Sequence, residues 1–270
     1  MHEWNEKDLE AEYPITKPDS NDLVVIHNLV ARATTRWSAD ESKLFLFSLT
    51  KIGSRNSENW VTIPKKEIYK ALGTDPHNAQ ALRETFKRTV MKSFVQLDHG
   101  QDEFLDGVLL VNLRSTKKEI SIQFNSAFMP LLENLSANFT DFYFRSIAGF
   151  EHTASIKLYM FLCSWHNPDF AINKRFIAKK DIPTVFGLKE GEYWRNYGQE
   201  NARFHWADFE KYCLNPAIQE INRSKDCDMF INEVKKDRDG RSVLGYTIAF
   251  SFLDETGHFK TKEDYHENLY

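Results

Sequence analysis

The chain has 270 residues, of which 41% are hydrophobic and 27% are charged, and this composition is typical of a folded protein. That length allows about two domains of ~100–150 residues each. The net charge of −4 argues against a general polyanion binder, and three cysteines without paired spacing argue against a disulfide scaffold. The N-terminus lacks the pattern of a signal peptide, and no charge-free run reaches the ~20 residues of a membrane span, so we expect a cytoplasmic protein without membrane contact.

The charges are unevenly distributed along the chain. Residues 1–20 hold six acids against two bases, and residues 251–270 hold five acids against two bases. The body between them carries 31 bases and 28 acids, a small positive surplus. We therefore expect a flexible acidic leader (1–20), a flexible acidic tail (254–270) and a mildly basic body, which leaves a DNA-binding function open.

The most informative feature of the sequence is an internal repeat. Residues 63–73 match residues 177–187 at five of eleven positions, and residues 43–47 match residues 157–161 at the same offset of 114. Later segments match at offsets of 123 and 126, as small insertions in loops would produce. The sequence therefore predicts two tandem copies of one domain, residues 21–135 and 136–253.

The first half of each copy is predicted from its local signals. Ser38, followed three residues later by Glu41, forms a capping-box pattern that begins a helix. Residues 60–63 are rich in β-branched and aromatic side chains and predict a strand. Residues 65–72 predict a short helix that Gly73 can end in a left-handed conformation.

The second half of each copy completes a recognisable motif. A turn leads to a longer helix that reaches about residue 93, and β-rich segments at about 104–113 and 119–124 enclose a polar tip. In the second copy the hairpin tip is 237–240, and Pro183 should shorten the counterpart of the 65–72 helix. Helix, strand, helix, turn, helix and hairpin is the order of a winged helix-turn-helix. The predicted fold class is α+β, helix-rich, with two tandem winged helix-turn-helix domains.

The third helix of the second copy, about residues 201–222, is the candidate DNA-reading element. One face is apolar and consists of Phe209, Cys213, Leu214, Ala217, Ile218 and Ile221. Polar residues recur on the other face: Lys211, Asn215, Gln219 and Asn222. In a major groove, lysine donates to guanine and asparagine or glutamine pairs with adenine, so this stripe fits base readout. A solvated helix face is the alternative interpretation.

Two features modify this candidate helix. Arg203 and His205 lie near its predicted start, and the N-terminal residues of recognition helices usually enter the groove. Pro216 lacks a backbone N–H and should kink the helix. Lys211 and Asn215, before the kink or at it, are therefore the stronger candidates for reading bases.

Further basic side chains are placed where winged helices contact the DNA backbone. In the second copy these are Lys179, Lys180, Lys235, Lys236, Arg238 and Arg241. In the first copy they are Lys65, Lys66, Arg83, Lys87, Arg88, Lys92, Lys117 and Lys118. An ordinary solvated surface remains an alternative for each set.

Several segments resemble the initiator proteins of theta-replicating, iteron-type plasmids. The resemblance covers about residues 21–252, and its most specific part is the string Pro-Ala-Ile-Gln-Glu-Ile-Asn at 216–222. The other segments that carry it are 21–24, 38–44, 139–142, 155–159 and 181–187. Members of that family tend to be basic at the start of the recognition helix, where this chain has Glu210.

The resemblance implies a function and a set of partners. It implies a bacterial protein with a first winged-helix domain that serves dimerisation and accessory DNA contacts and a second that reads iterons at a plasmid origin. Monomers in equilibrium with homodimers would bind double-stranded DNA, the dimers would repress their own gene, and the host initiator and replicative helicase would be recruited.

Two alternatives remain open at this point. The first is a transcriptional regulator of the same fold that never opens an origin. The second is a magnesium-dependent nucleotidyltransferase, because Asp226 and Asp228 form one Asp-x-Asp pair and Asp237 and Asp239 form another. The sequence contains no His-x-His pair and no P-loop, so we expect no catalysis, no metal and no cofactor.

Overall fold

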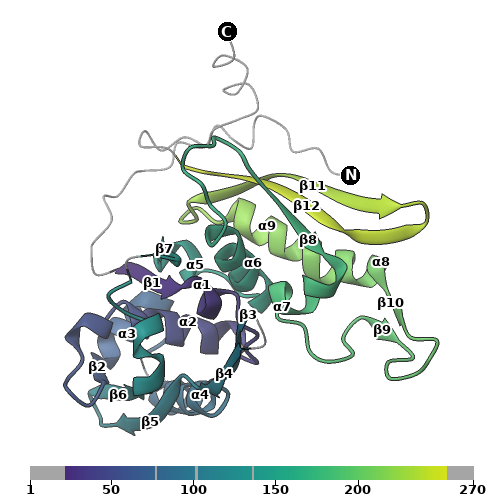
Figure 1. Ribbon diagram of the computed structural model, residues 1–270. Coiled ribbons are helices and arrows are strands. Elements are labelled where there is room, and N and C mark those ends of the chain that lie inside the picture. The colour runs from purple at the N-terminus through teal and green to yellow at the C-terminus, as the bar shows by residue number, and fades with distance from the viewer. Residues whose placement is uncertain (1–21, 77, 101–102, 136, 254–270) are drawn as a thin grey trace.

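Figure 1 shows the computed structural model, which describes residues 22–76, 78–100, 103–135 and 137–253. The predicted acidic leader and tail lie outside these residues. The described chain forms two winged-helix domains, so the predicted fold class is confirmed. No helix in the described part is long and apolar enough to cross a membrane.

The first domain begins with a short strand and helix and ends at a 3-10 helix. In chain order its elements are β1 (Leu23–His27), α1 (Asn28–Ala31), α2 (Ala39–Leu49), η3 (Ile52–Ser54), β2 (Trp60–Pro64), α3 (Lys65–Leu72), α4 (Ala79–Met91), β3 (Phe94–Gly100), β4 (Glu103–Val108), β5 (Leu110–Ser115), β6 (Glu119–Phe124) and η4 (Ser126–Leu131).

The second domain repeats the order of the main helices and sheet strands, but it has a small insertion before its third helix, a longer final hairpin and, within residues 137–253, no counterpart of β3–β4. Its elements are β7 (Phe139–Tyr143), α5 (Arg145–Ala148), α6 (Thr153–Cys163), β8 (Asn173–Ala178), η5 (Lys179–Asp181), α7 (Ile182–Phe186), β9 (Trp194–Arg195), β10 (Arg203–Phe204), α8 (Trp206–Phe209), the π-helix η6 (Glu210–Leu214), α9 (Asn215–Arg223), β11 (Met229–Asp239) and β12 (Ser242–Phe252).

The two domains have the same sheet topology. The order is β2-β6-β5 in the first and β8-β12-β11 in the second, so in each the strand before the helix-turn-helix pairs with the last strand of the hairpin. The short second helix ends in both copies at a glycine with a left-handed backbone, Gly73 (φ 62°) and Gly187 (φ 64°). α7 has only five residues because Pro183 occupies its first turn, as the sequence predicts.

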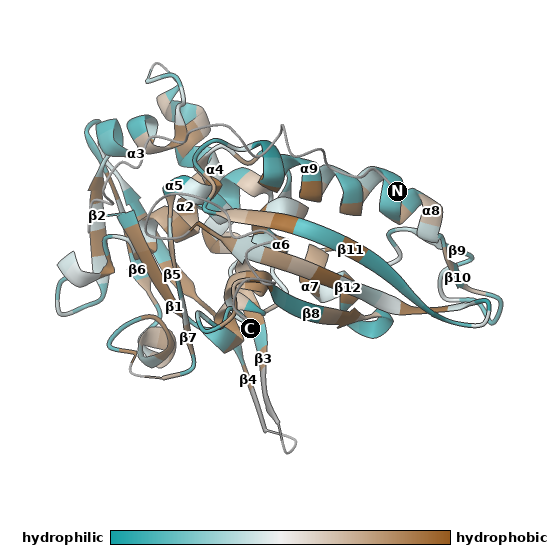
Figure 2. Ribbon diagram, turned by 90° about the horizontal axis from the view of Figure 1, so that it is seen from above, coloured by the Kyte–Doolittle hydropathy of each residue, from teal (hydrophilic) through white to brown (hydrophobic). Residues whose placement is uncertain are grey.

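One part of the first domain differs from the sequence prediction. The single β-rich segment expected at about 104–113 is divided into β4 and β5 at Leu109, which is buried and donates its N–H to the carbonyl of Ser93. β4 pairs with the unpredicted strand β3, and this extra hairpin projects from the molecule (Figure 2). In β3, exposed Phe94 and Gln96 alternate with buried Val95 and Leu97, the period of a strand.

The two domains are joined by a strand pair and by polar side chains that cross between them. β1 pairs antiparallel with β7 over five residues of each. Arg32 donates to both the hydroxyl and the carbonyl of Ser164, just after α6. The Nζ of Lys157, on α6, donates to the carbonyl of Ala33 at 2.7 Å.

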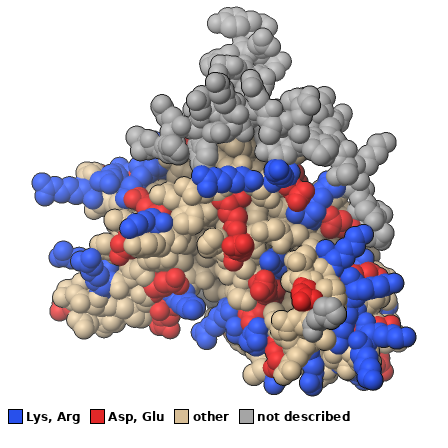
Figure 3. All heavy atoms as spheres, turned by 180° about the vertical axis from the view of Figure 1, so that it is seen from behind, with Lys and Arg blue, Asp and Glu red and all other residues tan. Residues whose placement is uncertain are grey.

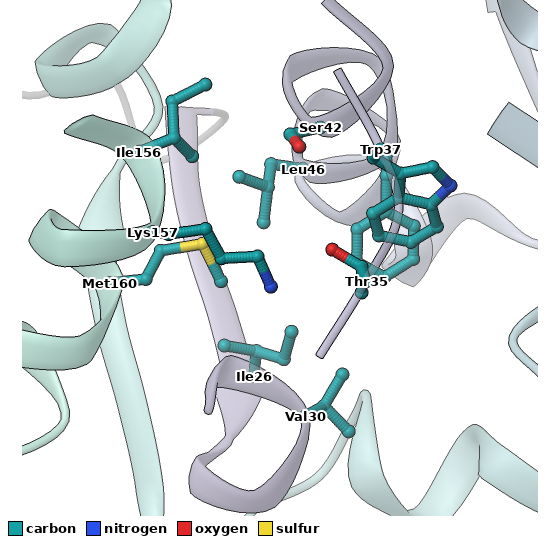
Figure 4. Close-up of a pocket in the computed structure, with 10 residues that line it drawn as sticks. Ile26, Val30, Thr35, Trp37, Ser42, Leu46, Ile156, Lys157 and Met160 are labelled. Atoms are coloured by element: carbon teal, nitrogen blue, oxygen red, sulfur yellow. The ribbon is translucent and has the colours of Figure 1, made fainter. Parts of the chain in front are cut away.

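Lys157 lines a small cavity between the domains (Figure 4). The lining comes from both domains: Ile26, Val30, Thr35, Trp37, Ser42, Phe45, Leu46, Ile156, Lys157 and Met160. Its volume of about 10 Å³ is roughly that needed by one water molecule. Burial lowers the pKa of Lys157 to about 8. The cavity is too small for a ligand, and it shows that the domain junction encloses a lysine.

Candidate nucleic-acid interface

The helix predicted to read DNA is present, but it begins later than predicted. It runs through α8, η6 and α9 from Trp206 to Arg223, whereas residues 203–204 form strand β10. Arg203 is therefore on a strand and not on the helix, which corrects the predicted start at about residue 201. The predicted apolar face is confirmed, since all of its members are buried: Phe209, Cys213, Leu214, Ala217, Ile218 and Ile221.

The irregularity predicted at Pro216 takes the form of a π-turn. Pro216 cannot donate a hydrogen bond to the preceding turn, and residues 210–214 adopt the wider π-helical geometry directly before it. Lys211 and Tyr212 are both exposed on this turn, and the Lys211 Nζ lies 4.8 Å from the centre of the Tyr212 ring. Tyr212, which is 58% exposed, is a candidate contact that the sequence reasoning did not name.

Only the first two residues of the predicted polar stripe are exposed to solvent. Lys211 and Asn215 are exposed, and Gln219 is half-buried. Asn222 has a structural role, because its amide donates to the carbonyl of Ile231 at 3.0 Å and its carbonyl oxygen accepts from the N–H of Ile231 at 2.8 Å. We therefore remove Asn222 from the candidate base readers.

The acidic residue at the start of the recognition helix is bound by the neighbouring hairpin. Lys236, on β11, lies 2.7 Å from Oε1 of Glu210, and the hydroxyl of Tyr246 donates to the same oxygen at 2.6 Å. Partial burial acts to raise the pKa of Glu210, but the hydrogen bonds from Lys236 and Tyr246 outweigh it and lower this pKa below its ordinary value. The Lys236 Nζ also lies 5.6 Å from the ring centre of Trp206. Lys236 thus fastens the hairpin to the helix.

The remaining cations of this hairpin fall into two groups. Lys235 pairs with Asp237 at 3.1 Å, whereas Arg238 and Arg241 are exposed and have no ion-pair partner among the described residues. The turn itself consists of Gly240 and Arg241, later than the predicted tip at 237–240, because residues 237–239 still pair with β12 as part of β11. Arg238 and Arg241 are therefore the hairpin side chains best placed to meet phosphates.

Of the basic residues around the start of the recognition helix, one lies next to a carboxylate and the others are exposed. The Nδ1 of His205 lies 2.6 Å from the carboxylate of Asp208, three residues further along the chain. Lys179 and Lys180 are exposed in η5, and the Lys179 Nζ lies 5.9 Å from the Trp206 ring centre. Arg203 is exposed on β10.

In the first domain, two predicted DNA contacts on or after α4 bind an internal acid instead. Glu41 is 1% exposed, and its carboxylate lies 3.0 Å from Arg88 and 2.8 Å from Lys92. Burial acts to raise the pKa of Glu41, but hydrogen bonds from Lys92, Ser38 and Arg88 lower it overall. The predicted capping box from Ser38 to Glu41 is confirmed by hydrogen bonds in both directions.

Lys65 is a third predicted contact with an internal role. It is buried, and its Nζ donates to the carbonyl of Thr116 at 2.7 Å, which fixes the base of the β5–β6 tip. We remove Lys65, Arg88 and Lys92 from the candidate interface for this reason. The other predicted contacts in this domain stay exposed: Lys66, Arg83, Lys87, Lys117 and Lys118.

The third helices of the two domains lie on the same side of the molecule. Figure 2 shows α4, α8 and α9 along one side, with β8 and the β3–β4 hairpin on the other. Seen from the helix side, lysine and arginine side chains gather over both domains, with acidic side chains between them (Figure 3). This arrangement could contact two segments of one DNA duplex.

The carboxylates proposed for the nucleotidyltransferase alternative do not form a site. Asp228 accepts a hydrogen bond from the hydroxyl of Tyr159 at 2.6 Å, and burial raises its pKa, whereas Asp226 is exposed. Across the described ranges, no group of three or more His, Cys, Asp or Glu side chains could hold a metal ion. The geometry therefore gives this alternative no support.

Known proteins share both the sequence pattern and the fold. Residues 23–163 match the family model described as "Initiator Replication protein, WH1", and residues 180–250 match "Initiator Rep protein, WH2". The structure of the Pi initiator protein in complex with iteron DNA superposes with a TM-score of 0.67 and 14% identity, covering 88% of this chain and 100% of that chain.

A second solved structure is more distant. Domains 2 and 3 of RctB give a TM-score of 0.45 at 12% identity, covering 80% of this chain and 83% of that chain. No curated protein sequence matches the chain.

Proposed function

Because the chain belongs to the initiator Rep protein family, we propose that it starts plasmid replication by binding duplex iterons at the origin, in the bacterial cytoplasm and without catalysis. The observation that carries this proposal is the recognition helix: its apolar face is buried, and Lys211 and Asn215 are exposed on the other. The Pi initiator, which shares the fold, was solved with iteron DNA.

In the proposed complex, the second domain (136–253) reads sequence. The helix α8–η6–α9 lies in the major groove, where Lys211 donates to guanine and Asn215 pairs with adenine. Arg238 and Arg241, at the hairpin tip, bind phosphates beside the groove. Lys179 and Lys180 contact the backbone on the other side of the helix.

The first domain (21–135) supplies accessory contacts. Helix α4 lies on the same side of the molecule as α9, and five exposed basic residues of this domain bind phosphates in a second groove. These residues are Lys66, Arg83, Lys87, Lys117 and Lys118. Because they are dispersed and interspersed with acids, they add affinity but little sequence preference.

A homodimer is the second part of the proposal, with the first domain as its interface. Met91, Phe94 and Val111 are 73%, 50% and 45% exposed, and they lie close together because Ser93 is hydrogen-bonded to Leu109 and Leu110. β5, which carries Val111, is an edge strand of its sheet. Exposed apolar side chains beside a free strand edge fit a second copy of this chain.

Sedimentation of two variants tests this dimer. Val111→Lys should shift the protein to a monomer, because a charge would be buried at the edge strand. Leu244→Lys is the matched control, since Leu244 is 49% exposed on the second domain, outside the proposed interface. Equal sedimentation of both variants and the wild type would move the interface elsewhere.

The dimer would repress the gene for this protein, and the DNA-bound monomer would recruit the host initiator and the replicative helicase. The family supports these roles. A reporter fused to the gene's own promoter should be repressed by the wild type and released by Val111→Lys. Host initiator and helicase should be retained on immobilised iteron DNA only when this protein is bound.

Binding to the DNA that flanks its own gene is the direct test of the proposed function. We expect protection of regularly spaced repeats. Lys211→Ala should weaken binding to a repeat by ~1–3 kcal/mol while leaving random DNA nearly unaffected. Lys174→Ala is the control, because Lys174 is exposed on β8, on the opposite side of the molecule. Protection without periodicity, or an equal loss on both DNAs, would contradict sequence reading by Lys211.

One experiment separates an initiator from a transcriptional regulator of the same fold. A plasmid with this gene and its upstream repeats as the sole origin should replicate in a suitable host, and Lys211→Ala should abolish replication. Tight, sequence-specific binding without replication would favour the regulator.

A further inference from the structure

The segment before the recognition helix is much longer than its counterpart in the first domain. In the first domain, five residues, 74–78, link the second and third helices, whereas in the second domain residues 188–205 do so. Residues 189–204, which we call the thumb, contain the two-stranded pair β9–β10. The thumb leads directly into α8, beside the tip of the β11–β12 hairpin (Figures 1 and 2).

The thumb holds a conformation that costs free energy. Tyr193 and Asn196 have positive φ angles of 61° and 54°, and this region is unfavourable for a bulky side chain such as tyrosine. Gly191 and Gly198 also have positive φ angles, of 76° and 77°. Strain of this kind persists only where surrounding contacts determine the conformation.

Those contacts are made by an aromatic cluster at the base of the thumb. Tyr193 packs edge-on against Phe204 and Phe209, with ring centres 6.4 and 5.9 Å apart. Phe204 also contacts Trp194 at 5.6 Å and Trp206 at 4.7 Å. Because Phe209 and Trp206 belong to the recognition helix, the thumb is fixed to that helix.

The thumb presents two arginines side by side. Arg195 on β9 is paired directly with Arg203 on β10, so both side chains leave the same face of the strand pair. Both are exposed, and neither has an ion-pair partner among the described residues. Like charges in directly opposite positions are destabilising. An anion between the guanidinium groups would remove this repulsion.

The thumb contains three acids, Glu190, Glu192 and Glu200, and among the described residues none of them forms an ion pair with Arg195 or Arg203. The carboxylate of Glu190 accepts from the hydroxyl of Tyr197 at 2.9 Å, and that of Glu192 accepts from the N–H of Lys189 at 2.8 Å. Glu190 and Glu192 both precede β9 in the chain, and each is bound by a group other than the two arginines. The two arginines are thus left for an external partner.

We propose that the thumb is a further DNA-contacting element, in which Arg195 and Arg203 together hold one backbone phosphate beside the groove that receives the recognition helix. Guanidinium groups match phosphate oxygens with paired hydrogen bonds, and two of them can hold one phosphate from two sides. This inference rests on the proposed function, because the thumb's position relative to DNA follows from the helix entering the groove.

The structure favours DNA over an acidic protein as the occupant. The thumb is joined to the recognition helix through Trp206 and Phe209, and it lies at the same end of the domain as the hairpin that carries Arg238 and Arg241. The thumb and the hairpin tip lie at the same end of the recognition helix, and this arrangement fits a single continuous ligand, the sugar–phosphate backbone.

Phosphate ethylation interference tests the proposal on the full chain. On iteron DNA, the wild type should lose binding when one particular phosphate beside the recognition site is ethylated. The double variant Arg195→Ala/Arg203→Ala should bind more weakly and become insensitive to ethylation at that phosphate. Lys174→Ala should keep the wild-type pattern. An unchanged pattern and affinity in the double variant would overturn the proposal.

The salt dependence of binding gives a second measurement. Removing one phosphate contact should flatten the plot of log affinity against log salt concentration by ~0.9, equally on iteron and random DNA. A loss confined to iteron DNA would instead show that the arginines read bases. If the wild type binds iteron DNA no more tightly than random DNA, the proposed function is wrong. If the wild type prefers iteron DNA and the double variant has the same affinity and salt dependence, only the proposal for the thumb is wrong.

Thermal unfolding of the wild type and of the double variant tests whether weaker DNA binding results from loss of structure. The two arginines repel each other without DNA, so the double variant should be at least as stable as the wild type. A destabilised double variant would show that the arginines support the thumb's own structure and would contradict the proposal.

Discussion

In the first domain, helix α4 runs without interruption from Ala79 to Met91, whereas the corresponding helix of the second domain is interrupted by a π-turn at residues 210–214. Basic side chains at the end of α4 turn inward to Glu41, which is buried in α2. On the π-turn, Lys211 stays exposed beside Tyr212. The same topology therefore pairs basic residues of the third helix with an internal acid in the first domain and leaves Lys211 of the third helix exposed in the second.

The same contrast appears at a repeated lysine. Lys43 on α2 and Lys157 on α6 occupy matching positions at the offset of 114, and both are buried. Lys43 pairs with Asp40 of its own helix at 3.2 Å, whereas Lys157 donates across the domain junction to Ala33. The duplicated position thus stabilises a helix in one domain and joins the domains in the other.

The largest expected effect concerns Lys157. Its pKa is about 8 in the folded protein, below the ordinary value of 10.5, so the unfolded state binds the proton more tightly. Stability should therefore rise as the pH increases from about 8 to 10.5, by up to ~3 kcal/mol at 1.36 kcal/mol per unit. In Lys157→Met this rise should disappear, as measured by urea unfolding at pH 7, 8.5 and 10.

Lys43→Met serves as the matched control for that experiment. Because Lys43 has a carboxylate partner and Lys157 has a carbonyl, only the Lys157 variant should lose the increase. If both variants keep the wild-type pH profile, the two lysines are equivalent and the contrast at this position is wrong.

The next effect concerns the inward ion pairs of the first domain. Glu41→Gln removes the buried charge that Arg88 and Lys92 share, and it weakens the capping box of α2. Since both cations stay partly exposed to water, we expect a loss of ~2 kcal/mol rather than the 3–5 of a fully buried pair. Because the pKa of Glu41 is lowered in the folded protein, this contribution should fade as the pH falls through that pKa.

Denaturant unfolding at pH 7 and at pH 3 checks both statements. Glu84→Gln is the control, since Glu84 forms only an exposed pair with Lys87 at 3.8 Å. A Glu41 variant that is as stable as the wild type but binds DNA more tightly would show that Arg88 and Lys92 are available to DNA after all.

Part of the fold and of the candidate site could be predicted from the sequence, and part could not. The repeat, Gly73 and Gly187, and the apolar face of the recognition helix all follow from local pattern, and the structure has them. The roles of Arg88 and Asn222 could not be predicted, because they depend on which helix or strand packs beside them. Their polar side chains look the same in sequence as exposed DNA contacts.

The predicted start of the recognition helix was wrong for another reason. The polar run before Trp206 contains no proline and no strand pattern longer than two residues, so nothing local separates a helix from the β9–β10 pair. The aromatic cluster that fixes this segment assembles residues from the thumb, the helix and β12, and such contacts are visible only after folding. Exposed Tyr212 was missed because an aromatic residue in a helix is usually assigned to the core.

The third prediction concerns Asn222, which ties α9 to β11. Asn222→Ala removes both hydrogen bonds to Ile231 and leaves a partly buried backbone pair unsatisfied, so we expect a loss of ~1–2 kcal/mol of stability. Binding preference between iteron and random DNA should stay unchanged. A change in that preference, measured by titration of both DNAs, would return Asn222 to the base-reading side chains.

The smallest effect tests whether the second domain truly leaves its charges for DNA. Glu210 is one of the acids that already bind a cation of this hairpin, since it pairs with Lys236 on a surface proposed to face phosphates. Glu210→Gln should cost less than ~1 kcal/mol of stability, because the side chains of Lys236 and Glu210 are still 22% and 31% exposed to water. With the acid neutralised and Lys236 released, affinity for random DNA should rise a few-fold and the salt dependence should steepen by up to ~0.9.

Glu84→Gln on α4 removes an acid from the other third helix and should change DNA binding less, because Glu84 does not restrain a cation of the hairpin. The informative contrary result for Glu210→Gln is a loss of affinity for iterons with none for random DNA. Carboxylates accept hydrogen bonds from cytosine in the major groove, so that loss would mean that Glu210 reads a base. The acid at the start of the helix would then be a source of specificity, and the link to Lys236 would serve to position it.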